Sequence, residues 1–170
     1  AGGIRFLSKI VGPFFSKLFP EVPKGHPAHG HMMMNFSANM LGLDNAATPF
    51  GIKAMQSLQE LNPSTEKASN AQIMFLCLHA AGLTLIPTAV IAARAITIGA
   101  DGSKSINPTD IFLPCLVATF IATLAAMTIV SIKQKIKLFQ PVIMGWVLGI
   151  SAIIAALVLL ILSMNTVSVN

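Results

Sequence analysis

The stretch "NFSANMLGLDNAATPFGIKAM" (residues 35–55) is unusually polar for a chain this hydrophobic. It contains three asparagines, together with Gly42 and Pro49, which are residues that interrupt helices. An ordinary apolar core gives no reason to place so many amide groups beside helix-breaking residues. What this stretch does therefore depends on the solvent around the rest of the chain.

The composition indicates a lipid bilayer as that solvent. Of the 170 residues, 54% are hydrophobic and only 10% are charged, whereas about 25% are charged in a typical soluble domain. Three runs contain no Asp, Glu, Lys or Arg, namely residues 68–93, 111–132 and 138–170. Each exceeds the roughly 20 residues that a helix needs to cross a membrane. We therefore expect an all-α integral membrane protein.

The order of apolar and basic segments predicts three regions. They are an amphipathic interfacial helix at 1–24, a membrane domain at 25–137 with a re-entrant segment at 31–54 and spans at 71–98 and 111–132, and a C-terminal transmembrane helix at 138–170. A buried helix packed on other subunits is the alternative for the first region. The net charge of +5 is explained by basic residues that flank the apolar runs and set their orientation, so we expect no nucleic-acid partner.

The re-entrant segment follows from the distribution of lysines. The sequence "KQKIK" (133–137) has three lysines and no acid, which predicts a cytoplasmic link. Counting spans back from this link puts both ends of 31–54 on the cytoplasmic side, so the segment must enter and return. Half-helices that meet inside a membrane need cover for their exposed backbone groups. We expect the helix breaks at three residues: Gly42, Pro49 and Pro87.

Polar residues near these breaks are our candidates for contact with a small polar solute, because transporters bind solutes at the ends of broken helices. The candidates are Asn35, Asn39, Asn45, Thr48, Asn70, Thr84 and Thr88. The alternative is that these side chains only hydrogen-bond packed helices to one another. Asp44 and Arg94 form a possible charge pair, although Arg94 could instead pair with Asp101 or extend to the membrane surface.

The remaining reactive side chains suggest no catalysis. The sequence has no nucleophile and base at a recognisable spacing, no phosphate-binding glycine loop and no paired carboxylates, so we expect neither an enzyme nor a cofactor. His79 is interpreted as a hydrogen-bonded buried histidine, with a proton relay as the alternative. The cluster "HPAHGH" (26–31) suits metal by residue type, but it lacks thiolates and carboxylates, so we expect no metal site.

One sequence pattern resembles a known family. Residues 35–54 read N-x-x-A-N-M-L-G-L-x-N-A-A-T-P-x-G-x-K-A, and "LFPEVPKGHPAHG" (18–30), "KASNAQIMFLCLHAAGLTLIPTAVIAARA" (67–95) and "NPTDIFLPCLVAT" (107–119) accompany this motif. The pattern resembles the spore maturation protein A family, which carries the nucleoside recognition (Gate) domain. The resemblance implies a multi-pass protein of the bacterial cytoplasmic (inner) membrane. It also implies that the chain is an A-type half, or a fragment of a fused A/B protein.

The resemblance and the polar breaks together predict membrane transport, in which a small polar solute, with a nucleoside-like molecule as one candidate, is bound or moved at the tips of broken helices. The alternative is a structural or regulatory membrane subunit of a cell-envelope complex without transport activity of its own. The expected partners are the lipid bilayer, the solute, and either further copies of the chain or a B-type half. The sequence "GWVLG" (145–149) has the G-x-x-x-G spacing of a close helix-packing face.

Overall fold

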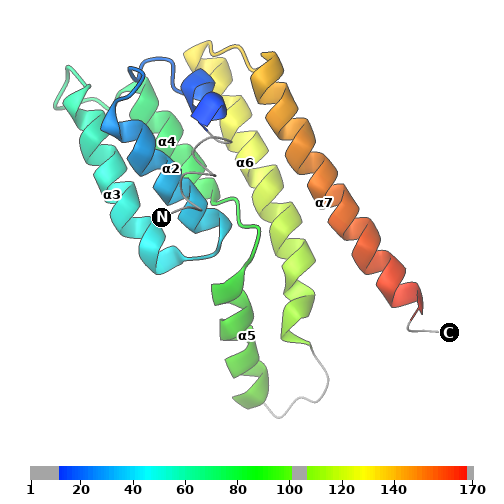
Figure 1. Cartoon of the computed structure of the whole chain (residues 1–170). Coiled ribbons are helices and arrows are strands. Elements are labelled where there is room, and N and C mark those ends of the chain that lie inside the picture. The colour runs from blue at the N-terminus through cyan, green and yellow to red at the C-terminus, as the bar shows by residue number, and fades with distance from the viewer. Residues whose placement is uncertain (1–11, 101–106, 168–170) are drawn as a thin grey trace.

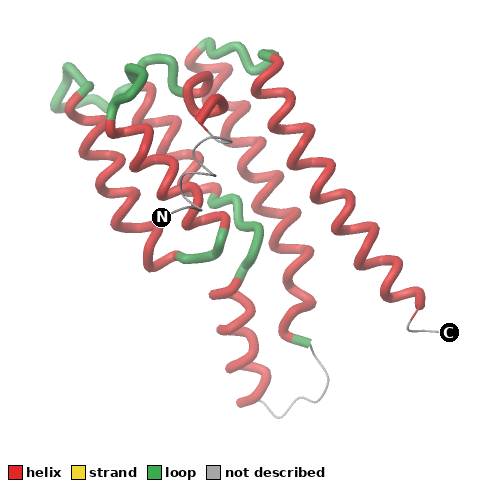
Figure 2. Tube along the Cα trace, in the orientation of Figure 1, coloured by secondary structure: helices red, strands yellow, loops and turns green. Residues whose placement is uncertain are grey.

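The computed structural model describes residues 12–100 and 107–167, and all regular structure in that part of the chain is helical (Figures 1 and 2). A helical segment at residues 12–18 comes first. The further elements are α2 (Pro27–Met40), α3 (Asp44–Glu60), α4 (Asn70–Ala81), α5 (Thr88–Ala100), the 3₁₀ turn η1 (Pro108–Ile111), α6 (Phe112–Gln134) and α7 (Pro141–Val167).

Helices α2 and α3 form an antiparallel hairpin. His26 caps the start of α2 by accepting a hydrogen bond from the Ala28 N–H, and Pro27 occupies the first turn, where a missing N–H costs nothing. The face of α3 against α2 is built from small residues, because Ala47, Gly51 and Ala54 recur every three or four positions and are buried. Both open ends of the hairpin lie at the end of the molecule where α6 leads into α7 (Figure 1).

Helices α4 and α5 occupy the segment that the sequence predicted as one span at 71–98 with a break at Pro87. The structure divides it at residues 82–87 into helices of 12 and 13 residues. A capping box of Ser69 and Gln72 starts α4, and Gly82 ends it in the left-handed conformation. Neither piece alone reaches the length of a membrane span, so the third predicted span stays a prediction.

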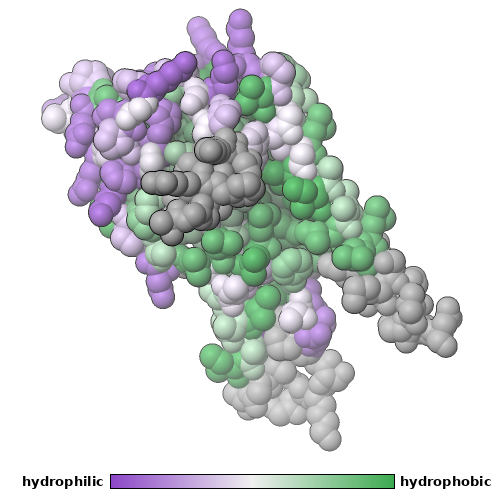
Figure 3. All heavy atoms as spheres, viewed as in Figure 1, coloured by the Kyte–Doolittle hydropathy of each residue, from purple (hydrophilic) through white to green (hydrophobic). Residues whose placement is uncertain are grey.

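Helices α6 and α7 are the two helices long and apolar enough to cross a membrane. The first candidate span is Thr109–Gln134 and the second is Pro141–Leu160. Only 28% and 11% of their most apolar stretches are buried inside the molecule, so neither is the enclosed core helix of a soluble domain. Hydrophobic residues cover this side of the molecule, whereas hydrophilic residues gather at the end where α3 leads into α4 (Figure 3). These observations point to a membrane protein.

The core is closed by an aromatic cluster from the N-terminal segment. Phe15 packs edge-on against Phe36 of α2, with ring centroids 5.5 Å apart, and Phe14 lies 5.4 Å from Trp146 of α7. Leu18 and Phe19 are also buried. Residues 1–11 of the expected amphipathic helix lie outside the described residues. The described part therefore joins α2 to α7, and its aromatic face packs within this chain.

Candidate functional site

The tip of the α2–α3 hairpin is a tight turn centred on Gly42. Its φ of +65° is left-handed, a conformation that glycine adopts without strain. The Gly42 N–H bonds to the Asn39 carbonyl at 3.0 Å, and the Leu43 N–H bonds to the Ala38 carbonyl at 2.9 Å. These bonds pair carbonyls that the end of α2 would otherwise leave exposed, so α3 can begin at once.

This tip is seated against the break between α4 and α5. The Met40 carbonyl accepts hydrogen bonds from the N–H groups of Leu85 at 2.8 Å and Ile86 at 3.2 Å. The Thr88 hydroxyl donates to the Gly42 carbonyl at 2.9 Å. A Cβ at Gly42 would collide with the Ile86 carbonyl. Two helix interruptions, about 40 residues apart in sequence, therefore interlock through their backbones.

The break is also held by α6. The Thr84 N–H donates to the Thr119 hydroxyl of α6 at 3.3 Å, and the Thr84 hydroxyl donates to the Gly82 carbonyl at 2.8 Å. Pro87 is buried and its carbonyl accepts from the Ile91 N–H at 3.0 Å in the first turn of α5. Thr119 could not be singled out from the sequence, because its hydroxyl lies within a continuous apolar helix.

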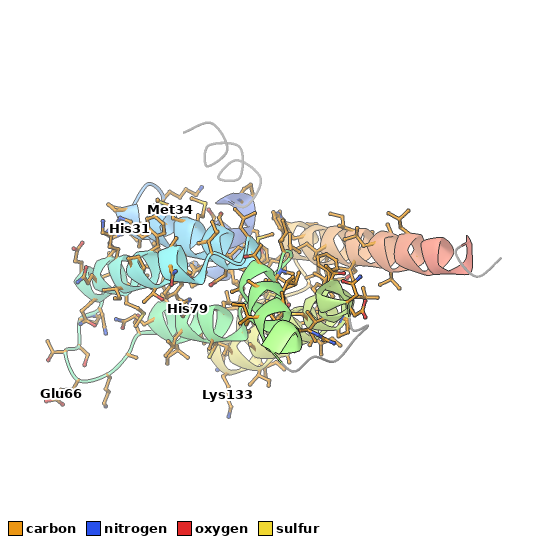
Figure 4. The ribbon with its side chains drawn as sticks, turned by 90° about the horizontal axis from the view of Figure 1, so that it is seen from below. His31, Met34, Glu66, His79 and Lys133 are labelled. Atoms are coloured by element: carbon orange, nitrogen blue, oxygen red, sulfur yellow. The ribbon has the colours of Figure 1, made fainter. Side chains whose placement is uncertain are left out.

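A polar cluster lies behind the tip, where α2, α3 and α4 meet. Asn35 is 1% exposed, and its Nδ2 donates to the Ala47 carbonyl at 2.6 Å, which turns Oδ1 toward α4. Nδ1 of His79 lies 3.1 Å from that oxygen. Nδ2 of Asn39 lies 3.3 Å from Nδ1 of His79 and 3.4 Å from Oδ1 of Asn35. Figure 4 shows His79 among these helices, whereas Glu66 and Lys133 lie at the outer edge.

The tautomer of His79 decides which of its two amide contacts is a hydrogen bond. When Nδ1 carries the hydrogen it donates to Oδ1 of Asn35, and when Nδ1 lacks it the nitrogen accepts from Nδ2 of Asn39. The sequence interpretation of His79 as a hydrogen-bonded histidine agrees with this geometry, although the ring is only half-buried.

Gly51 makes room for the cluster. A Cβ at this position would lie 3.0 Å from Nδ2 of Asn35 and 3.6 Å from Cε1 of His79. Such contacts would displace the asparagine from the Ala47 carbonyl. The absence of a side chain at Gly51 is therefore part of the site, and the sequence analysis did not single it out.

The other predicted residues fall into two places. Asn45 and Thr48 are exposed on the first turns of α3, near the tip. Asn70 lies at the opposite end of α4 from the break, where its Nδ2 donates to Glu21 at 2.8 Å and its carbonyl accepts from Gln134 at 2.7 Å. Asn70 therefore does not join the other candidates.

Pro49 and the expected charge pair also differ from expectation. Helix α3 begins at Asp44, so Pro49 lies inside it rather than at its start, and it cannot bond the Asn45 carbonyl. Pro49 is thus no helix break, because the turn at Gly42 already redirects the chain. The side chain of Asp44 lies outside the described part, and Arg94 is half-buried on α5, so their pairing stays a prediction.

The histidines of "HPAHGH" make separate hydrogen bonds. Nδ1 of His31 lies 2.9 Å from the Ser57 hydroxyl, and Nε2 of His29 lies 3.3 Å from the Val22 carbonyl. Burial lowers the pKa of His29 below its usual 6.5; the bond to Val22 raises the pKa and the nearby His26 lowers it. Among the described residues, no three His, Cys, Asp or Glu side chains are grouped to hold a metal ion.

Comparisons with known proteins match the part of the chain that holds the hairpin and the break. The family model described as Gate, nucleoside recognition, matches residues 1–97. Spore maturation protein A of Bacillus subtilis (strain 168) is 45% identical over 129 residues, which cover 76% of this chain and 63% of that relative. The chain thus spans less than two thirds of the relative's length. No solved structure matches.

Proposed function

We propose that this chain, which belongs to the nucleoside recognition (Gate) family, is a membrane transport protein that binds a small polar solute where the α2–α3 hairpin meets the α4–α5 break. The observation that carries the proposal is the contact of two helix interruptions through Met40, Gly42 and Thr88. Irregular backbone at membrane depth is tolerated where protein or a watery cavity covers it. Transporters use such broken helices to bind their substrates.

The proposed topology is that of a multi-pass protein of the bacterial inner membrane. Helices α6 and α7 each cross once, α4 and α5 together cross once, and the hairpin enters from the cytoplasmic side and returns. Its open ends lie at the same end of the molecule as the link that carries Lys133, Lys135 and Lys137, and its tip lies partway along α6 (Figure 1). Positive charge at that end favours a cytoplasmic location.

The chemistry of the site suits a neutral solute with several hydrogen-bonding groups. Asparagine amides both donate and accept, threonine hydroxyls do the same, and Nε2 of His79 donates or accepts according to the tautomer. A nucleoside-like molecule has such groups, and the family is described by nucleoside recognition. Asn39, Asn45 and Thr84 are the side chains that we assign to solute contact. We further propose that the chain works with more copies of itself or with a B-type half.

The first test measures thermal stability of the purified protein with nucleosides, nucleobases and small metabolites. A ligand at 100 times its dissociation constant adds about 2.7 kcal/mol to the free energy of unfolding. Asn39→Leu should abolish the shift, and Asn45→Leu should reduce it. Asn70→Leu is the matched control, because Asn70 lies at the other end of α4, and its shift should persist. An equal shift in all three variants would refute the site assignment.

A structural membrane subunit is the second candidate, and the fixed hydrogen bonds of Asn35 favour it, because amides in packed helices also serve as interhelical contacts. Single cysteines at positions 39, 45 and 48 separate the two functions once the free Cys77 and Cys115 are replaced. A solute cavity should let small polar thiol reagents reach all three positions from water. Protection of all three would favour the structural subunit.

A further inference from the structure

A second polar feature lies away from the hairpin tip, at the end of the molecule where the N-terminal segment precedes α2. It is an open cleft of about 530 Å³. Its lining includes Ser16, Lys24, His26, His29, Gly30 and Met33. The volume falls within the range of about 300–1,000 Å³ typical of small-ligand sites. The solute site proposed above uses none of these residues.

The cleft gathers positive charge without a compensating acid among its described lining residues. Lys24 is exposed at its edge, and His26 is half-buried beside it. His26 accepts the Ala28 N–H at Nδ1, at 3.2 Å, so its Nε2 carries a hydrogen and can donate. Burial lowers the pKa of His29. An anion would pair with the ammonium of Lys24 and accept a hydrogen bond from Nε2 of His26.

The start of α2 does not by itself make this site. The N–H of Ala28 bonds to His26 Nδ1, and the N–H of His29 bonds to the His26 carbonyl at 3.1 Å, so these donors are already used. The recognition groups are instead the ammonium of Lys24 and Nε2 of His26. The cleft is open beside Gly25 and Gly30, where an added Cβ would meet nothing within 4 Å.

The position of the cleft favours one class of anion. The start of α2, which lines the cleft, lies at the end of the molecule where α6 leads into α7 (Figure 1), and the two candidate membrane spans extend from that end. The cleft also has apolar lining from Met33. A ligand that matches this combination has an anionic head at the membrane surface and an apolar body. We propose that the cleft binds the phosphate headgroup of an anionic phospholipid.

Native mass spectrometry of the purified protein in detergent tests the proposal with phosphatidylglycerol, phosphatidylcholine and inorganic phosphate as probes. Wild type should retain phosphatidylglycerol in preference to phosphatidylcholine. Lys24→Gln should weaken this binding about fivefold, the contribution of one lysine near an anionic surface. Gly30→Leu keeps every charge but fills the cleft, and it should remove most of the binding.

Lys133→Gln is the matched control, since it removes one exposed lysine from α6, on the opposite side of the molecule (Figure 4). It should leave phosphatidylglycerol binding unchanged. Melting temperatures of the variants will show that each is folded, as expected for three exposed positions. Equal losses in Lys24→Gln and Lys133→Gln, or wild-type binding by Gly30→Leu, would overturn the proposal. Retention of inorganic phosphate without phosphatidylglycerol would overturn it as well.

Discussion

The hairpin region, α2 to α4, and the helical pair α6–α7 differ in how their polar side chains are bonded. Thr119 and Gln134 of α6 bond neighbouring segments, but other polar side chains of the pair bond only their own helix. Asn35 of α2 connects three helices, because it bonds the backbone of α3 and the imidazole of α4. Thr123 of α6 donates instead to the Thr119 carbonyl of its own helix, and Ser151 of α7 donates to Val147. A hydroxyl satisfied within its own helix needs no neighbour, so such a helix can face lipid.

The exposed side chains support the same contrast. On α6, Ile129 is 62% exposed, and on α7, Leu148 is 61% exposed. In water such exposed apolar surfaces favour aggregation, whereas contact with lipid chains suits them. The hairpin region is therefore organised by specific contacts between helices, whereas α6 and α7 leave large apolar side chains exposed, as a lipid-facing surface would. Substitutions matched between the two regions test this difference.

The largest effect is expected at the hairpin tip. Gly42→Ala places a Cβ against the Ile86 carbonyl and forces alanine into a φ of +65°. Backbone strain and overpacking each cost about 1–3 kcal/mol, so we expect a loss of about 3 kcal/mol or more in the free energy of unfolding. Thermal unfolding in nanodiscs measures the loss.

Gly25→Ala is the control for strain alone, because Gly25 has a φ of +85° but nothing within 4 Å of an added Cβ. It should cost about 1 kcal/mol. If both variants lose the same amount, the contact between the tip and the break contributes nothing, and the interlocked arrangement is wrong.

A smaller effect is expected in the polar cluster. Asn35→Ala removes the acceptor for Nδ1 of His79 in a buried place, and an unsatisfied buried group costs about 1–3 kcal/mol. Thr123→Val on α6 removes a hydroxyl that bonds only its own helix, so the loss there should stay below about 1 kcal/mol. Chemical unfolding of the two variants in the same detergent gives the comparison.

A double-mutant cycle with His79→Phe identifies the partner of Asn35. Phenylalanine keeps a ring beside Phe75, which stacks on His79 with centroids 6.0 Å apart. Residues that share a hydrogen bond show coupling of about 0.5–3 kcal/mol. Additive losses would mean that Asn35 acts through the Ala47 carbonyl and Asn39 rather than through His79.

The α2–α3 hairpin could be predicted from the sequence because two independent signals indicate it. Counted back through the expected spans, the lysines of 133–137 predict both ends of 31–54 on one side, and Gly42 supplies a turn between two apolar stretches. The long helices α6 and α7 were predicted within a few residues, since uncharged runs of that length have few alternatives. Entry of the hairpin into the membrane stays a prediction.

The site was predicted less well, because its contacts depend on how distant segments meet. Asn70 resembles the other asparagines in sequence, and only the direction of α4 places it at the far end. Proline is common in the first turn of a helix. The turn at Gly42, however, lets α3 begin at Asp44, five residues before Pro49. Thr119 and Gly51 have roles because Thr84 lies against Thr119 and Asn35 lies against Gly51 in the fold. A single sequence carries no signal that pairs such distant residues.

The smallest changes in the free energy of unfolding are expected when one glycine in each region is replaced by alanine. Alanine is favoured over glycine in a helix by about 1 kcal/mol. At Gly145 of α7 nothing lies within 4 Å of an added Cβ, so Gly145→Ala should raise the free energy of unfolding by up to about 1 kcal/mol. At Gly51 the added Cβ would lie 3.0 Å from Nδ2 of Asn35, so Gly51→Ala should lower stability by about 1 kcal/mol.

The sign of the change at Gly145 decides what α7 faces. Stabilisation, measured by thermal unfolding beside the molecular mass in detergent, agrees with a face of α7 that meets only lipid. Destabilisation with a drop in mass would mean that the G-x-x-x-G face of Gly145 and Gly149 packs on another copy or a B-type half, where small residues allow close approach. The contrast between the hairpin region and the pair α6–α7 would then be wrong, because α7 would also depend on specific contacts with another helix.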